Sequence, residues 1–287
     1  MNIQVKGHSG CSVEIIRENN QLLILKSTYD KGYLNRLYKQ AEKQKQAAQK
    51  EYQHIRIPQI FDIIKNEESV SIKMEYVYSK NFIEYFESAG FEQISYFIKA
   101  LILFIEKEIH NCSVQIVKKD VLTKKYEDVK NKILSNCLLQ EDPIIHSILD
   151  KSSLIFENVQ DMKMPIGLCH GDLTFSNILF NGNNYYLIDF LDSFVESPLL
   201  DIVKIRQDSA YLWSQLLYIH SFDHIRLQLI SNHIDNAIDH YFLKYEWYRD
   251  YYKYFQLMNF LRILQYAKED NIIDYLKKVS NRILYEL

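Results

Sequence analysis

The sequence predicts a two-lobed α+β protein, in which a small N-terminal lobe of antiparallel β-sheet with one helix precedes a larger, mainly α-helical lobe. Short β-branched or alternating runs fill the first 80 residues, and apolar residues recur at spacings of three and four through most of the rest. Only 7 Gly and 4 Pro occur among 287 residues, and so few turn residues indicate long helices. We place the lobes at residues 1–78 and 79–287.

The N-terminal lobe shows three strand-like runs, a helical stretch rich in Lys, Gln, Glu and Ala, and two further strand-like runs. Turn residues separate the runs, and Pro58 ends the helical region. The expected strands are 2–6, 12–17, 22–26, 59–65 and 69–77, and the expected helix is 33–52.

The C-terminal lobe reads as helix with one interruption. Segments 82–109, 112–160 and 198–287 have helical patterns, although the boundaries within 112–160 are weak. Between them, 178–180 and 185–189 form strand-like runs around an Asn-Gly-Asn-Asn turn, which predicts a β-hairpin.

Composition narrows the classes of partner and compartment. A net charge of -3, from 34 basic and 37 acidic residues, gives no electrostatic case for nucleic acid. The longest apolar stretch, 100–105, is too short to span a bilayer, and the first residues lack the apolar run of a signal peptide. The four cysteines form no CxxC pair. We therefore expect a cytoplasmic protein with reduced thiols and no membrane insertion, while its oligomeric state stays open.

The most informative segment, 169–180, reads Cys-His-Gly-Asp-Leu-Thr-Phe-Ser-Asn-Ile-Leu-Phe. It contains Asp172 and Asn177, and Asp189 follows twelve positions after Asn177. An Asp can accept the proton of an attacking hydroxyl, and the oxygens of Asn177 and Asp189 are hard ligands that suit Mg²⁺. The hairpin between Asn177 and Asp189 would bring these two side chains face to face.

This pattern resembles the catalytic and metal-binding loops of the protein-kinase-like superfamily, in its aminoglycoside phosphotransferase and choline kinase branch. The resemblance implies a two-lobed kinase-like fold that binds ATP and Mg²⁺ and moves the γ-phosphate to a small-molecule hydroxyl. It implies Asp172 as catalytic base, with Asn177 and Asp189 as catalytic metal ligands. It also implies that His170 braces the loop and that Asp201 binds the loop backbone.

On the nucleotide side the resemblance implies Lys26 as the phosphate-binding lysine. Glu42, 16 residues later, is the expected acidic partner of Lys26, with Glu51 as the competitor. The turn containing Ser9 and Gly10 would cover the phosphates. Backbone groups of Glu75 and Val77 would pair with adenine, these residues being at the expected hinge between the lobes.

The acceptor is the least determined part of the site. Acidic groups near aromatic rings would suit a cationic acceptor such as an amino sugar, choline or ethanolamine, although carboxylates also bind neutral sugar hydroxyls. Core packing is the simpler interpretation of the aromatic residues, and the spacing of His220, Asp223 and His224 is interpreted as surface. The acceptor candidates are Asp192, Asp208 and Trp213, followed by Glu196 and Tyr211.

Three other functions compete with a small-molecule kinase. A protein kinase would have Arg in place of Gly171 and a Gly after Phe190. A non-catalytic kinase-like nucleotide-binding protein would have no need to retain the base Asp172. A metal-dependent hydrolase would need more His or carboxylate ligands than the motifs supply.

Overall fold

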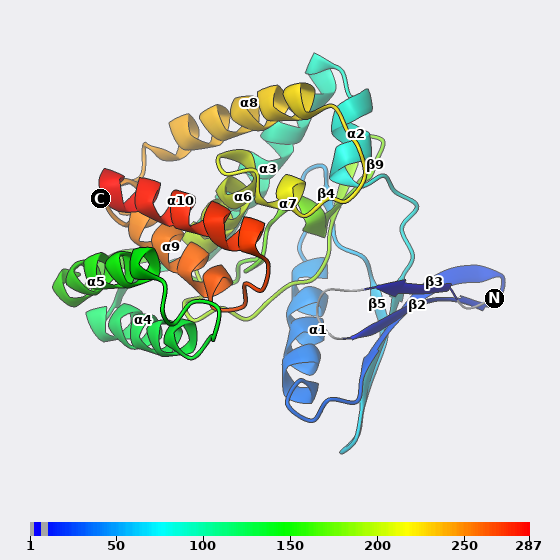
Figure 1. Ribbon diagram of the computed structural model, residues 1–287. Helices are drawn as coiled ribbons and strands as arrows, with labels where there is room; N and C mark the ends of the chain where they lie inside the picture. The colour runs from blue at the N-terminus through cyan, green and yellow to red at the C-terminus, as the bar shows by residue number, and fades with distance from the viewer. Residues whose placement is uncertain (1–2, 7–10) are drawn as a thin grey trace.

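The computed structural model describes residues 3–6 and 11–287, and its β-sheet and helices occupy opposite sides with α1 (Leu34–Ala48) between them (Figure 1). The sheet is five-stranded and antiparallel, in the order β1-β2-β3-β6-β5. The α+β fold class predicted from the sequence is confirmed. The sheet strands are β1 (Ile3–Lys6), β2 (Ser12–Glu18), β3 (Gln21–Thr28), β5 (Ile60–Lys65) and β6 (Val70–Glu75).

A small apolar core joins α1 to the sheet. Leu37 and Ala41 of α1 are buried against Val70 and Ile72 of β6. These α1 residues recur at helical spacing, so one face of the helix is committed to the sheet. The helix ends at Ala48, four residues before the predicted end at 52, because the N–H of Gln49 turns back to the carbonyls of Gln46 and Ala47.

The helical lobe surrounds a single larger core. The helical pattern over 82–109 corresponds to two helices, because Asn81 and Glu84 form a capping box at the start of α2 and Gly90 is the N-cap of α3. Its helices are α2 (Phe82–Ser88), α3 (Phe91–Asn111), α4 (Lys119–Leu134), α5 (Pro143–Asn158), α6 (Pro198–Ser209), α7 (Trp213–Leu216), α8 (His224–Phe242), α9 (Glu246–Leu264) and α10 (Asp270–Glu286).

Two β-structures in this region differ from the expectation. β7 (Ser113–Val117), predicted as helix, pairs antiparallel with β8 (Met162–Ile166), 45 or more residues away in the chain. Its partner decides its conformation, since a five-residue run is too short for periodicity to identify. β4 (Ile55–Arg56) runs parallel to β10 (Asn184–Leu187) and was not predicted.

The predicted hairpin is confirmed and positions the site. β9 (Ile178–Asn181) pairs antiparallel with β10, and Gly182 occupies the turn with φ of 58°. The motif loop enters β9, and the chain leaves β10 towards Asp189. No helix among the described residues is long and apolar enough to cross a membrane.

Candidate active site

The β9–β10 hairpin brings the two halves of the motif together. Ile178 pairs with Leu187 at its open end, and the Ile188 N–H donates to the Asn177 carbonyl at 3.1 Å. Asn177 therefore lies beside the segment that carries Asp189. The twelve-residue spacing has a simple physical meaning, since it is the length of one short hairpin with its flanking residues.

The Asp172 carboxylate is held from two sides. The Asn177 amide donates to Asp172 Oδ2 at 2.9 Å and to the Asp172 carbonyl at 2.8 Å. The Lys204 ammonium of α6 lies 3.1 Å from Oδ1. Burial raises the pKa of Asp172, but Lys204, His170 and Asn177 together outweigh it and leave that pKa below its usual value. Asp172 is thus an ionised carboxylate with fixed orientation.

His170 braces the loop and is neutral. Its ring is fully buried and packs on Phe190, with 4.3 Å between ring centroids. Nε2 donates to the Ile188 carbonyl at 2.8 Å, while Nδ1 accepts the Asp172 N–H at 3.2 Å. Burial lowers the pKa of His170 to about 4. These contacts support the bracing role and leave no proton-transfer task for this ring.

The backbone at position 171 explains why a glycine stands where a protein kinase has an arginine. Its φ is +84°, and a Cβ there would lie 2.2 Å from the Leu191 carbonyl oxygen. The Leu191 N–H in turn donates to the His170 carbonyl at 2.9 Å. The motif loop and the segment after Asp189 therefore touch backbone to backbone, which any side chain at 171 would prevent.

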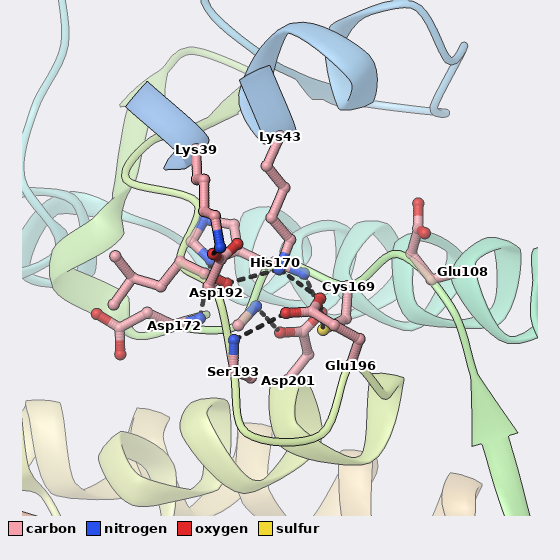
Figure 2. Close-up of polar contacts among 12 residues, drawn as sticks. Lys39, Lys43, Glu108, Cys169, His170, Asp172, Asp192, Ser193, Glu196 and Asp201 are labelled. Carbon is pink, nitrogen blue, oxygen red and sulfur yellow. Dashed lines mark hydrogen bonds and ion pairs between the residues drawn. The ribbon is translucent and has the colours of Figure 1, made fainter. Parts of the chain in front are cut away.

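Asp201, at the start of α6, holds the same loop from below. Its two carboxylate oxygens accept the N–H groups of His170 and Gly171, each at 2.7 Å (Figure 2). Burial raises the pKa of Asp201 to about 7 against these two hydrogen bonds. The contact with loop backbone is the one expected from the sequence.

Lys26 pairs with Asp189 instead of the expected glutamate. Its ammonium lies 2.7 Å from Asp189 Oδ1, and Asp189 adopts a left-handed φ of 61°, an uncommon conformation for a non-glycine residue. Glu42 is exposed, and Glu51 lies beyond the end of α1, where its carbonyl accepts Lys107. The expected Lys26–Glu42 pair is therefore wrong for this structure, and so is the competitor Glu51.

The rotation of α1 is the physical reason. A small cavity lined by Lys26, Gln40, Gln44 and Asp189 shows which side chains face inward. Glu42 lies about 200° around the helix from both glutamines, since each residue turns the helix by about 100°. Counting residues from Lys26 placed the glutamate at a plausible distance along the chain but on the wrong face.

Of the other residues predicted to bind nucleotide, the structure describes Glu75 and Val77. Glu75 ends β6, where its backbone N–H donates to the Gln59 carbonyl at 2.8 Å and its carboxylate accepts the Gln59 N–H at 3.1 Å. Val77 follows in the irregular connection to α2. Glu75 and Val77 thus lie on the connection between sheet and helices. Ser9 and Gly10 lie outside the described residues.

The oxygens at Asn177 and Asp189 fit the implied magnesium. Asn177 uses its Nδ2 for Asp172, so its Oδ1 is the atom left to face a cation. Asp189 offers Oδ2 beside the oxygen that contacts Lys26. No cluster of three or more His, Cys, Asp or Glu side chains in the described ranges could hold a metal. Mg²⁺ is commonly held by one or two side chains plus phosphate oxygens, which matches this donor set.

Part of the chain is similar in sequence to a known protein family. Residues 124–226, which include the motif loop, Asp189 and α6, match the phosphotransferase enzyme family (APH). The predicted resemblance to the aminoglycoside phosphotransferases is confirmed, and the choline kinase part of it stays a prediction. No curated protein matches the chain.

Solved aminoglycoside phosphotransferases share the fold along nearly the whole chain. A structure of APH(2")-IIia with GDP and kanamycin aligns with a TM-score of 0.63 at 13% identity, covering 100% of this chain and 93% of that one. A thermostable mutant of APH(4)-Ia, in a ternary complex with AMP-PNP and hygromycin B, aligns with a TM-score of 0.60 at 11% identity, covering 99% and 93%. Spectinomycin phosphotransferase APH(9)-Ia, with ADP and its antibiotic, gives 0.52 at 14% identity, covering 99% and 92%.

Among the predicted acceptor residues, Asp208 has a different task in this structure. It is 1% exposed and accepts the Phe175 N–H at 2.6 Å, the Ser214 N–H at 3.0 Å and the Ser214 hydroxyl at 2.9 Å. Burial raises the pKa of Asp208 to about 6. It is a structural anchor between the motif loop and α7, and its assignment to the acceptor is wrong here.

Two further acceptor candidates, Asp192 and Trp213, make contacts of different kinds. Asp192 is exposed, 3.8 Å from Lys39, and Trp213 packs against Tyr275 at 5.9 Å between centroids. The His220, Asp223 and His224 segment is exposed, and Asp223 caps α8 through the Arg226 N–H. The preference for packing at Trp213 and for surface at this segment agrees with these contacts.

Sequence reasoning missed two basic residues near Asp172. Lys204 follows Asp201 by three residues on α6, a helical spacing that could have placed it beside the loop. Arg262 of α9 lies over the Phe194 ring at 5.4 Å. Burial lowers the pKa of Arg262, and the charge of Asp172 acts in the opposite direction. No local pattern around Arg262 points to Asp172.

Proposed function

We propose that this chain is an ATP- and Mg²⁺-dependent phosphotransferase that moves the γ-phosphate to a hydroxyl of a small molecule. The observation that carries the proposal is the Asp172 carboxylate, oriented by Asn177 and Lys204, together with the Lys26–Asp189 pair, whose segment the β9–β10 hairpin returns to the Asn177 backbone. This arrangement would supply a base, a cation and two oxygens that can ligate a metal. Such transfer depends on positioning and charge neutralisation more than on covalent catalysis.

Each residue has a role that its contacts support. Asp172, ionised and fixed, accepts the proton of the acceptor hydroxyl. Asn177 holds that carboxylate through its amide nitrogen and offers its oxygen to Mg²⁺, with Asp189 as the second ligand. Lys26 binds the α- and β-phosphates. The bound Mg²⁺ would supply charge neutralisation of the phosphate oxygens.

The finer nucleotide assignments complete the proposal. The backbone groups of Glu75 and Val77 would bind adenine at the connection between residues 1–78 and 79–287, and Ser9 and Gly10 would cover the phosphates. We propose ATP as donor, and GTP belongs beside it in any assay, because GDP occupies one structural neighbour. We further propose that the protein acts in the cytoplasm and binds no nucleic acid.

The acceptor is proposed as an amino alcohol such as choline or ethanolamine, or as a sugar or amino sugar. Structural neighbours were solved with kanamycin, hygromycin B and spectinomycin. In this chain Asp208 is occupied elsewhere, Asp192 is exposed, and the charged neighbours of Asp172 include Lys204 and Arg262. Hydroxyl compounds that carry phosphate or carboxylate groups therefore belong in the acceptor panel together with the cationic ones.

The test is product formation with Mg²⁺ and ATP or GTP across choline, ethanolamine, neutral and amino sugars, sugar acids and phosphates, and aminoglycosides. We expect phosphorylated product with one acceptor class, and a fall in kcat of about 10²–10⁴-fold in Asp172→Asn. Asp128→Asn, which removes a partly exposed carboxylate of α4 that pairs with Lys125 and Lys132, is the control and should retain activity. A protein that binds nucleotide but transfers phosphate to no acceptor would favour the non-catalytic alternative. A protein that binds no nucleotide would contradict the proposal.

A further inference from the structure

Lys43 of α1 makes a buried charged contact across to the segment that follows Asp189. Its side chain is 7% exposed, although lysine normally keeps its ammonium in water. The ammonium donates to Glu196 Oε2 at 2.6 Å and to the Leu191 carbonyl at 2.6 Å (Figure 2). Figure 2 shows this side chain descending from α1 into the group of polar residues around the catalytic loop.

Glu196 lies at the end of the turn 191–196, which Lys43 contacts at both ends. Its Oε1 accepts the Ser193 N–H at 2.7 Å, and its backbone carbonyl accepts the Gly167 N–H at 2.9 Å. The Cys169 thiol donates to its Oε2 at 3.4 Å. The turn from Leu191 to Glu196 is thus fastened to the strand that leads into the catalytic loop and to α1 at the same time.

The neighbourhood of Lys43 keeps it charged. Burial lowers its pKa, but Cys169, Glu196 and Asp201 outweigh that effect and leave the pKa above its usual value. An ammonium buried without its partner is strongly unfavourable, so the ion pair and the docking of α1 form or break together.

The inward face of α1 offers no such charged connection to Lys26. Gln44 donates to the Pro58 carbonyl at 3.1 Å, and Gln40 contacts the Tyr33 hydroxyl at 3.3 Å. Lys26 instead contacts Asp189, only two residues before Leu191. Both lysines therefore act on one short segment, Lys26 on the carboxylate that would ligate Mg²⁺ and Lys43 on the backbone just beyond it.

We propose that Lys43 and Glu196 are positioning residues for the metal site, which fix the Asp189 segment against α1 and thereby set how tightly Mg²⁺ and nucleotide bind. The inference rests on the proposed function, because it assigns a metal-binding task to Asp189. Neither residue touches the reacting atoms; both act through the Leu191 carbonyl and the turn that follows it. Partners that orient metal ligands in this indirect way commonly change metal affinity or activity by about 10–100-fold when removed.

The test compares Lys43→Met with Lys39→Met in the full chain. Lys39 lies one turn earlier on α1, 67% exposed and 3.8 Å from Asp192, so it matches Lys43 in chemistry but not in burial. AMP-PNP binding is measured by calorimetry over a range of Mg²⁺ concentrations, which needs no turnover. We expect Lys43→Met to raise the Mg²⁺ concentration for half-maximal binding about 10-fold or more. Lys39→Met should stay within about twofold of wild type.

Two further variants separate positioning from folding. Lys43→Arg keeps the charge and should recover most of the wild-type Mg²⁺ response. Glu196→Gln keeps a hydrogen-bond acceptor but loses the charge, and should raise the Mg²⁺ requirement by at least about threefold. Because Glu196 is more exposed than Lys43, this variant decides the matter if Lys43→Met does not fold.

The outcomes distinguish this inference from the proposed function. Folded Lys43→Met or Glu196→Gln with a wild-type Mg²⁺ response, in a protein whose wild type transfers phosphate, would overturn the positioning role alone. A lower melting temperature with that same response would do so too, since it would show a purely structural pair. A wild type that transfers no phosphate, with Mg²⁺-dependent binding weakened in Lys43→Met, would leave the positioning role supported while the proposed activity fails. A wild type that binds no nucleotide would overturn both.

Discussion

The sequence predicts roles for residues of the motif loop and of helix α1. The predicted neighbours within the loop are in contact in the structure, whereas the predicted partner of Lys26 on α1 is not. In the loop, the Asn177 amide donates to the Asp172 carboxylate, and the β9–β10 hairpin returns the segment that carries Asp189 to the Asn177 backbone. In α1, Glu42 points away from Lys26, and Lys43 makes the charged contact with the rest of the site.

The difference lies in what each assignment requires. The loop residues are joined by a tight hairpin, so sequence spacing alone limits where they can be. A pair between a strand and the helix after it depends also on how the helix is rotated about its axis, where an error of two positions moves a side chain by about 200°. Spacing arguments are therefore strong within a hairpin and weak across a helix.

The largest expected effect comes from removing the anchor beneath the loop. Asp201→Ala would leave the buried N–H groups of His170 and Gly171 without an acceptor and should lower the free energy of unfolding by about 2–5 kcal/mol. Urea denaturation at fixed pH measures it. Asp274→Ala, which removes an exposed carboxylate of α10, should change that free energy by less than about 0.5 kcal/mol. Equal losses would show that the loop is not held by Asp201.

The backbone contact at Gly171 can be tested against a second glycine with a similar backbone. Gly171→Ala should destabilise by about 2–4 kcal/mol, through the left-handed conformation and the clash with the Leu191 carbonyl. Gly182→Ala, with φ of 58° but nothing within 4 Å of the added Cβ, should cost only about 1 kcal/mol. Thermal and urea unfolding of both variants measure the two losses of unfolding free energy. Equal losses would show that the close approach of Gly171 to Leu191 does not contribute to stability.

The charge beside Asp172 should appear in the pH dependence of activity. Lys204 helps to hold the pKa of Asp172 below its usual value, so Lys204→Met should raise that pKa. Since the base proposed here would act in its ionised form, the acidic limb of the kcat/KM profile should move to higher pH. The profile is measured with the best acceptor from the panel. A lower plateau with an unmoved acidic limb would mean that Lys204 acts on the phosphate or the acceptor instead.

The smallest expected effect concerns the glutamate that the sequence favoured. Glu42→Gln should leave kcat/KM for ATP within about twofold, because an exposed carboxylate contributes little. Lys26→Met, measured beside it, should weaken nucleotide binding by about tenfold or more through the loss of a charged hydrogen-bond donor. A large loss of kcat/KM in Glu42→Gln would mean that α1 rotates during activity and brings Glu42 to Lys26. The predicted partner on α1 would then be right, as the loop contact is.

The sequence by itself determined the fold class, most strands and helices, and the motif that unites Asp172, Asn177 and Asp189. It could do so because hydrophobic period, turn chemistry and hairpin length are local properties of the chain. It also indicated a resemblance to the phosphotransferase enzyme family, whose model matches residues 124–226, a range that contains these residues.

The tertiary structure alone decided which face of α1 meets the site, that Asp208 anchors the loop, and that Lys204 contacts Asp172. It also decided the β7–β8 pair, whose strands are joined by two intervening helices. The physical reason is common to all of these. Each depends on contacts between segments that are distant in sequence. Packing of the whole core decides how a helix is rotated and which side chains are buried, and local sequence patterns do not predict this.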